Sequence, residues 1–270
     1  MKLYEAHNYF TTHKEWNKCF CVGANKTGTS SLEMIFENLL GFQTCASQIQ
    51  ANTTSEIIKG NYTPLLRLGD SFDFHKDLPA SQGNTYVALD AIFPKSKFIL
   101  TLRDPEGWAH SFLNYYSKYF IEAAFDVKAS AELQAHYSGF GAAWISHYWY
   151  KEVEYIKNSF KLSDIETKSD LLSQDLQLIK LITRDYAQRN QAIKDHFYMR
   201  SDDLLCIDIA KEKNTDRLLR FLKLPTLVRC NWPNVKPDRI PTNKHRALLN
   251  IQIAKGNLPA SMHKNRDEPK

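Results

Sequence analysis

Residues 20–41 of this 270-residue chain read Phe20-Cys-Val-Gly-Ala-Asn-Lys-Thr-Gly-Thr-Ser-Ser-Leu-Glu-Met-Ile-Phe-Glu-Asn-Leu-Leu-Gly41. A short apolar run is followed by a loop rich in glycine and hydroxyl side chains, and the loop leads into a helical pattern. Apolar residues recur at i, i+3, i+4, i+7 and i+8 from Leu32 to Leu40, and Gly41 is a typical helix terminator. The stretch predicts a strand, a loop and a helix whose apolar face packs on a sheet.

The loop between this strand and helix suits a phosphate group. Gly28 permits close approach of a ligand to the backbone, and the hydroxyl and N–H groups after it lie at the start of a helix, where anions bind. Gly23 and Gly28 have the spacing of a Walker A loop, but Thr29 occupies the position of its lysine. The lysine of this loop, Lys26, lies two residues before Gly28. This departure disfavours an ordinary ATPase or kinase, while a polar turn without a ligand stays open as an alternative.

A second anion-binding element begins at residues 97–102, Lys97-Phe-Ile-Leu-Thr-Leu102, an apolar run typical of a buried parallel strand. Arg103 follows it directly, Asp104 is a typical helix N-cap, and Pro105 suits the first helical position. Ser111 lies close to two turns after the cap, about 10 Å along the axis, and so projects from the same side of the helix. Arg103 and Ser111 could grip one phosphate together, although each could instead have an ordinary structural role.

Together the two elements resemble the sulfotransferase family, whose donor is 3′-phosphoadenosine 5′-phosphosulfate. Asn25-Lys-Thr-Gly-Thr-Ser-Ser-Leu32 is similar to its 5′-phosphosulfate loop, and Arg103-Asp-Pro105 with Ser111 is similar to its 3′-phosphate site. The resemblance is closest to the branch with K-T-G-T-[ST]-S-L, D-x-x-x-D-x-P and F-P-x-S-K-F-I-L-T-x-R-D-P motifs. It covers residues 18–116 and resumes at 186–224. The donor contacts that it implies are Asn25, Lys26, Thr27, Gly28, Thr29, Ser30, Arg103 and Ser111.

The resemblance also implies a catalytic base between the two elements. Asp73-Phe-His-Lys-Asp77-Leu-Pro79 fits the D-x-x-x-D-x-P segment, and Asp77 is expected to take the proton of the acceptor. Better-known cytosolic sulfotransferases use histidine in this region, which keeps His75 as a second candidate, and Asp73 falls on the earlier aspartate. A solvated turn with Asp77 as a helix cap is the structural alternative. Lys26 is expected to stabilise the leaving phosphate, and no metal is demanded.

The expected fold class is α/β, a central parallel sheet flanked by helices as in the P-loop-like sulfotransferase fold, in a single domain over residues 1–270. Strands are predicted at 20–22, 42–45, 97–102 and 204–208. Residues 117–200 are predicted to form a helical segment that covers the acceptor pocket. One apolar face of this segment is marked by Leu171, Leu172, Leu176, Ile179 and Ile182.

The net charge of +5 is unevenly distributed. Residues 211–270 hold 14 Lys or Arg and 5 Asp or Glu, a balance of +9 (14 − 5), which leaves −4 (5 − 9) for the rest of the chain. This basic C-terminal segment could close over the 3′-phosphate of the donor or attract an acidic acceptor, or it could be a solvated face. Its prolines and lack of a recognition-helix pattern disfavour nucleic-acid binding.

No stretch approaches the roughly 18 to 20 apolar residues of a membrane span, and we expect a cytoplasmic protein. Its five cysteines lack metal-type spacing and are expected to be reduced thiols. The predicted reaction is in-line transfer of a sulfuryl group to a hydroxyl or amine of a small-molecule or glycan acceptor. The rival hypotheses are a P-loop small-molecule kinase and a nucleotide-binding protein without turnover.

Overall fold

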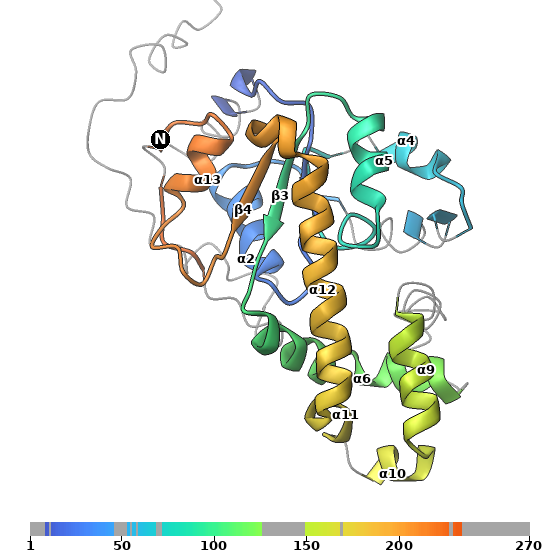
Figure 1. The fold of residues 1–270 in the computed structure, drawn as a ribbon. Coiled ribbons are helices and arrows are strands. Elements are labelled where there is room, and N and C mark those ends of the chain that lie inside the picture. The colour runs from blue at the N-terminus through green and yellow to red at the C-terminus, as the bar shows by residue number, and fades with distance from the viewer. Residues whose placement is uncertain are drawn as a thin grey trace, which may run out of the picture.

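The computed structural model describes residues 9–10, 12–45, 53–54, 56–57, 59–68, 72–125, 149–167, 170–226 and 229–233. Residues 126–148 of the expected helical segment, and the basic C-terminal segment beyond residue 233, lie outside this described part. The described elements form a central sheet with helices on both faces, and a further group of helices beyond the carboxyl ends of its strands (Figure 1). Among the described helices, none is both long and apolar enough to cross a bilayer.

Four parallel strands form the sheet in the order β2-β1-β3-β4. They are β1 (Cys19–Cys21), β2 (Phe74–His75), β3 (Lys97–Thr101) and β4 (Leu204–Ile207). Strands β1, β3 and β4 confirm three predicted strands to within one residue at each end. The strand predicted at 42–45 is reduced to one bridge, from Thr44 to Phe74. The sequence pattern does not reveal β2, because its two buried residues stand among charged ones.

Helices and helical turns surround this sheet. Around it lie α2 (Thr29–Met34) and its π-helical continuation η1 (Ile35–Leu39), α4 (Thr63–Leu68), α5 (Thr85–Ile92), α12 (Leu176–His196), the 3-10 turn η2 (Tyr198–Asp203) and α13 (Asp216–Phe221). The group beyond the strand ends consists of α6 (Pro105–Phe125), α9 (Tyr150–Ser159), α10 (Leu162–Thr167) and α11 (Leu171–Gln174).

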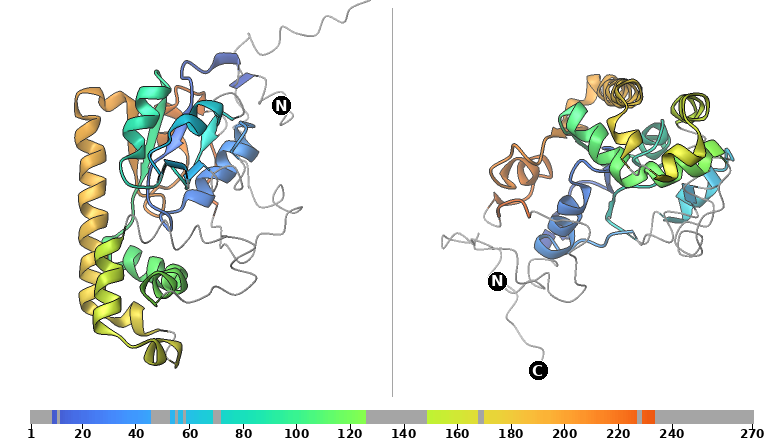
Figure 2. Two further views of the ribbon diagram at one scale, coloured as in Figure 1. Left: turned by 90° about the vertical axis from the view of Figure 1, so that its right-hand side faces the viewer. Right: turned by 90° about the horizontal axis from the view of Figure 1, so that it is seen from below.

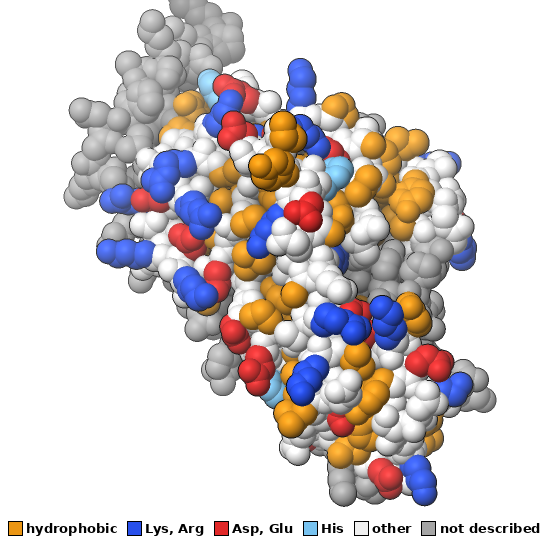
Figure 3. All heavy atoms as spheres, in the orientation of Figure 1, with side chains coloured by type: hydrophobic (Ala, Val, Ile, Leu, Met, Phe, Trp, Pro, Cys, Tyr) orange, Lys and Arg blue, Asp and Glu red, His pale blue; other side chains and the backbone are white. Residues whose placement is uncertain are grey.

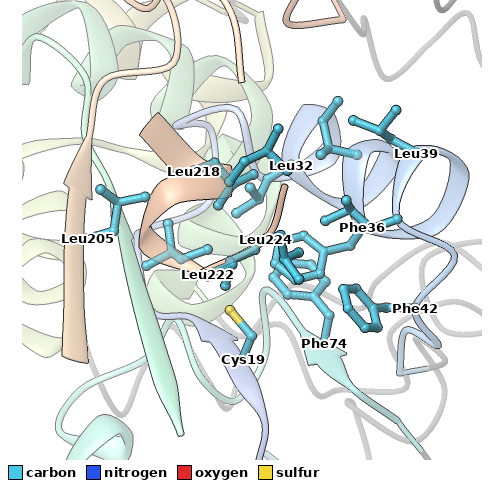
Figure 4. Packing of buried hydrophobic residues seen from close by; sticks show 14 of the residues in the cluster. Cys19, Leu32, Phe36, Leu39, Phe42, Phe74, Leu205, Leu218, Leu222 and Leu224 are labelled. Atoms are coloured by element: carbon cyan, nitrogen blue, oxygen red, sulfur yellow. The ribbon is translucent and has the colours of Figure 1, made fainter. Parts of the chain in front are cut away.

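The alternation of side chains along β1 explains the layers. Cys19 and Cys21 lie in a buried cluster with apolar residues of α2, η1 and α13, part of which Figure 4 shows. Phe20 and Val22 lie in a second cluster with residues of α5 and α12. Burial of both faces is typical of a parallel sheet with helices on either side. The α/β fold class predicted from the sequence is therefore confirmed.

The strand order also locates a crevice. Strand β1 has β2 on one side and β3 on the other, and the chain reaches β2 and β4 by way of helices on opposite faces, α2 on one and α12 on the other. In such sheets ligands bind outside the carboxyl ends of the strands where the order reverses. Here that position is the end of β1 and β3.

The group of helices beyond the strand ends begins with α6. The Asp104 carboxylate accepts a hydrogen bond from the Gly107 backbone N–H (2.8 Å), and Pro105 is the first helical residue, which confirms the predicted cap. Apolar side chains of α6, α9, α11 and α12 form a third cluster. Helix α12 belongs to both parts of the molecule, because it runs from this group along the sheet (Figure 2).

The apolar face predicted at residues 171–182 is wrong at Leu176. Asp175 ends α11 and caps α12, since its carboxylate accepts the Leu178 N–H at 2.7 Å. Leu176 therefore starts a new helix and is 71% exposed. Aspartate at an N-cap breaks a helical pattern that apolar spacing alone would continue.

Candidate active site

The segment at residues 23–31, which joins β1 to α2 and includes the first turn of α2, is called the β1–α2 loop here and is fixed against β3. A Cβ atom at Gly23 would lie 2.0 Å from Thr101 Oγ1, so only glycine fits there. The Thr27 hydroxyl donates to the Ala24 carbonyl (2.5 Å) and lies 2.6 Å from the same Thr101 hydroxyl. The loop turns through two residues with positive φ, Lys26 at 71° and Gly28 at 95°. Its conformation is thus set by contacts beneath it, which leaves its outer side for a ligand.

One cavity of about 820 Å³ lies at this loop and at the ends of β1 and β3. It brings together residues that the sequence separates by more than 80 positions. The predicted site residues in its lining are Asn25, Lys26, Thr27, Gly28, Thr29, Ser30, Asp77, Arg103 and Ser111. Of the predicted site residues, His75 does not line it.

Arg103 lies beside the β1–α2 loop. Its Nη1 donates to the Lys26 carbonyl oxygen at 3.2 Å, and its backbone N–H donates to the Tyr186 hydroxyl at 3.1 Å. The ammonium of Lys26 lies 4.2 Å from the centroid of the Tyr115 ring, one helical turn after Ser111 on α6. The two cationic side chains therefore occupy the same edge of the sheet and the same cavity.

Asp77 is tied to the β1–α2 loop. Its Oδ1 accepts hydrogen bonds from the Asn25 amide (3.1 Å) and the Thr29 hydroxyl (3.0 Å), and its Oδ2 accepts one from the Lys76 ammonium (2.6 Å). It does not cap the next helix, because α5 has Asn84 at its N-cap. Its φ of 58° is rare for a residue with a side chain. Such backbone conformations cluster at functional sites.

Lys76 is a cavity residue that sequence reasoning missed. Its ammonium forms ion pairs with Asp77 and with Glu33 (3.2 Å). Burial lowers the pKa of Lys76, but the two carboxylates outweigh burial and raise it above the usual value. Burial in turn raises the pKa of Glu33. The only sequence signal was the position of Lys76 directly before the expected base.

His75 lies beneath the site. It is 2% exposed, and its Nε2 donates to the Leu78 carbonyl at 2.8 Å. Burial lowers the pKa of His75 to about 4, so the ring is neutral near pH 7. Asp73 also lies outside the cavity, where it pairs with Lys14 and accepts the Gln43 N–H. Both residues therefore support the local structure rather than face the cavity.

The far wall of the cavity comes from the residues that follow β4 and from the segment at 231–233. The Ser31 hydroxyl donates to the Pro233 carbonyl (2.7 Å), and Trp232 Nε1 donates to the Asn214 carbonyl (2.8 Å). In the described part of the basic C-terminal segment, the lining residues are Glu212, Lys213, Asn231, Trp232 and Pro233, and Lys213 is the basic one among them. The described residues contain no group of three or more His, Cys, Asp or Glu that could hold a metal ion.

Comparison with known proteins agrees with this geometry. A family model described as a sulfotransferase domain matches residues 18–237. The match includes the β1–α2 loop, Asp77, Arg103 and Ser111, and it spans well over half of the chain. No curated protein matches the chain. The chain therefore belongs to the sulfotransferase family.

Proposed function

We propose that the protein transfers a sulfuryl group from 3′-phosphoadenosine 5′-phosphosulfate to a hydroxyl or amine of a small-molecule or glycan acceptor. The observation that carries this proposal is the shared cavity, in which the β1–α2 loop, Arg103 and Asp77 meet. Location in the cytoplasm and a single domain over residues 1–270 stay predictions.

The residues present fit a donor that is anionic at both ends. The β1–α2 loop offers N–H groups, hydroxyls and Lys26 to a phosphosulfate, while Arg103 and Ser111 offer a guanidinium and a hydroxyl to a 3′-phosphate. The hydrogen bond from Arg103 to the Lys26 carbonyl places the second group beside the first. The cavity volume of about 820 Å³ lies within the range of cofactor and ligand sites.

The proposed chemistry is an in-line displacement. The acceptor oxygen or nitrogen forms a bond to sulfur, the bond from sulfur to the 5′-phosphate oxygen breaks, and the acceptor proton passes to Asp77. Lys26 would stabilise the negative charge that grows on the departing phosphate. Its ammonium already lies within the cavity, over the ring of Tyr115.

Asp77 is the base in this proposal rather than His75. Asp77 lines the cavity and is held by two side chains of the β1–α2 loop, whereas His75 is buried below it. A base must come within hydrogen-bond reach of the proton that it accepts. The contacts from Asn25 and Thr29 keep the carboxylate beside the loop that would hold the donor.

Calorimetry with adenosine 3′,5′-bisphosphate and with ATP tests the proposal. We expect the bisphosphate to bind at least about tenfold more tightly, a difference of about 1.4 kcal/mol. Comparable ATP affinity would favour the small-molecule kinase. A screen with sulfur-labelled donor and a panel of alcohols, amines and glycans would then identify the acceptor class. Bisphosphate binding without transfer to any of them would favour a binding protein without turnover.

A further inference from the structure

Arg189 on α12 makes an unusual set of contacts with the main chain. Its Nη1 donates to the Val22 carbonyl at 2.7 Å, its Nη2 to the Ala80 carbonyl at 3.2 Å, and its Nε to the Gly83 carbonyl at 3.0 Å. Three carbonyl oxygens from two separate segments thus converge on one partly buried guanidinium. Neither segment is close to Arg189 in the sequence.

The first segment is the root of the β1–α2 loop. Val22 follows β1 directly and precedes Gly23, and its N–H donates to the Ile99 carbonyl of β3 at 2.9 Å. On the other side β2 ends at His75, whose partner in β1 is Phe20. The described sheet therefore has no strand residue opposite Val22 on that side. The Val22 carbonyl lies just beyond the last residue pair of β1 and β3, and Arg189 donates to it there.

The second segment is the base turn, defined as residues 77–83. It is folded by its own backbone, since the Ser81 N–H donates to the Asp77 carbonyl (2.8 Å) and the Gln82 N–H donates to the Pro79 carbonyl (3.0 Å). Ser81 is 3% exposed, and its hydroxyl donates to Asn25 Oδ1 at 3.1 Å. The turn is therefore held together by its own backbone, and Arg189 donates to two of its carbonyls.

We propose that Arg189 is a positioning residue for sulfuryl transfer, which ties the base turn to the root of the β1–α2 loop and so fixes Asp77 relative to the bound donor. This inference rests on the proposed function. Arg189 does not line the large cavity, so it acts through the two segments and not by contact with the donor. It lines instead a neighbouring cavity of about 320 Å³, which shares Asn25 with the large one.

The chemistry of the side chain supports this role. A guanidinium presents several N–H donors in a rigid plane, whereas a lysine ammonium is a compact group on a flexible stem. A guanidinium can therefore donate to three separate carbonyls at once in a fixed geometry, whereas a lysine ammonium would not hold all three in place. Without the guanidinium, each of the three partly buried carbonyl oxygens would lose one hydrogen bond. Unpaired buried acceptors are costly, so both segments would tend to shift toward water.

The test is calorimetric titration of adenosine 3′,5′-bisphosphate into wild type, Arg189→Ala and Arg189→Lys, with hydrogen exchange of residues 77–83 followed with and without the ligand. We expect Arg189→Ala to bind about tenfold more weakly and Arg189→Lys to fall between. In wild type the bisphosphate should slow exchange in the base turn. In Arg189→Ala the bisphosphate should no longer slow this exchange. Millimolar guanidinium should restore the affinity of Arg189→Ala for the bisphosphate, but it should not restore that of Arg189→Lys.

Arg184→Ala is the matched control. Arg184 lies on the same helix, its side chain is 48% exposed, and it pairs with Asp185 at 3.1 Å. It should keep wild-type affinity and protection. Circular dichroism and melting temperature establish that each variant is folded at the temperature of titration. If Arg189→Ala does not fold, Arg189→Lys carries the test, with an expected loss of about threefold or more.

The possible failures are distinguishable. If the wild-type protein does not bind the bisphosphate more tightly than ATP, that result contradicts both the proposed function and this inference. If the wild-type protein binds as expected and the folded Arg189 variants keep its affinity and its base-turn protection, the result contradicts the inference about Arg189 alone.

Discussion

Among individual side chains, Lys26 is the one on which the proposed chemistry depends most. It stands in a left-handed backbone conformation and its ammonium lies over Tyr115 inside the cavity. Asp77 is the other non-glycine residue of the site with positive φ. Backbone strain of this kind persists only where the surrounding contacts enforce it. Here the next residue, Thr27, is held by hydrogen bonds to the Ala24 carbonyl and the Thr101 hydroxyl.

Replacement of Lys26 tests its role in charge stabilisation. We expect Lys26→Ala to lower the rate of transfer from labelled donor by about 100- to 1,000-fold, the usual effect of removing one preorganised charge-stabilising group. Lys95→Ala is a matched control, because Lys95 also has positive φ (64°) but is exposed and lies outside the cavity. A wild-type rate in Lys26→Ala would exclude the lysine from the mechanism.

Replacement of Asp77 tests the base. Asparagine keeps the shape of the side chain but cannot take up the acceptor proton, so Asp77→Asn should lower the transfer rate by about 100- to 10,000-fold. Affinity for adenosine 3′,5′-bisphosphate should change much less. Asp73→Asn is the control, since Asp73 pairs with Lys14 away from the cavity. Full activity of Asp77→Asn would place the base elsewhere.

Among the strands, the contact between β1 and β3 sets the shape of the β1–α2 loop. A Cβ atom at Gly23 would meet Thr101 Oγ1 at 2.0 Å, and also its backbone N at 2.6 Å and O at 2.8 Å. We therefore expect Gly23→Ala to destabilise the protein by about 3 kcal/mol or more, at the upper end of overpacking costs, as measured by urea unfolding. Adding Thr101→Ala should not restore stability, because the backbone contacts remain. If the double variant regains wild-type stability, the Thr101 hydroxyl alone causes the clash, which would contradict this expectation.

Among the helices, α9 and α12 bring two acidic side chains together. Glu152 on α9 is fully buried, and burial followed by the charge of Asp185 on α12 raises the pKa of Glu152 to about 7. The folded state thus binds this proton more tightly than the unfolded chain, where the pKa is 4.5. The stability that the proton supplies is fully present below pH 4.5 and is lost as pH rises through 7.

Melting temperatures measured between pH 4.5 and pH 8 test this effect. Glu152→Gln stays neutral, so it should melt above wild type at pH 8 and lose this advantage toward pH 4.5. Glu154→Gln changes an exposed glutamate of the same helix and should follow wild type throughout. A difference between Glu152→Gln and wild type that does not vary with pH would contradict the account.

The elements that the sequence predicted well are those with local causes. The strand before Gly23, the strand at 97–102 and the Asp104 cap each depend on residues within one turn or one strand. Strand β2 could not be predicted, because both of its residues pack against partners far away in the sequence, Phe36 of η1 on Phe74 and Phe20 of β1 on His75. Arg189 was missed for the same reason, since its partners lie far away in the sequence, and so does Glu33, one of the two partners of Lys76.

For the protein as a whole, the parallel sheet is what brings the two segments proposed to bind the donor to one place. Basic side chains add to this on the side of α13, where exposed Lys and Arg gather beside the cavity wall (Figure 3). Such a surface attracts an anionic donor. Lys211, Lys213, Arg217, Arg220 and Arg229 are its described members. The role of the basic segment beyond residue 233 stays a prediction.

The central claim is that one nucleotide spans the β1–α2 loop and Arg103. Calorimetry of adenosine 3′,5′-bisphosphate against adenosine 5′-monophosphate, in wild type and in Arg103→Ala, tests it most directly. The two ligands differ only in the 3′-phosphate, whose charge-assisted bond to Arg103 is worth about 1.5 to 3 kcal/mol, or roughly 10- to 150-fold in affinity. We predict this preference in wild type and its loss in Arg103→Ala. An equal preference in both proteins would contradict the claim.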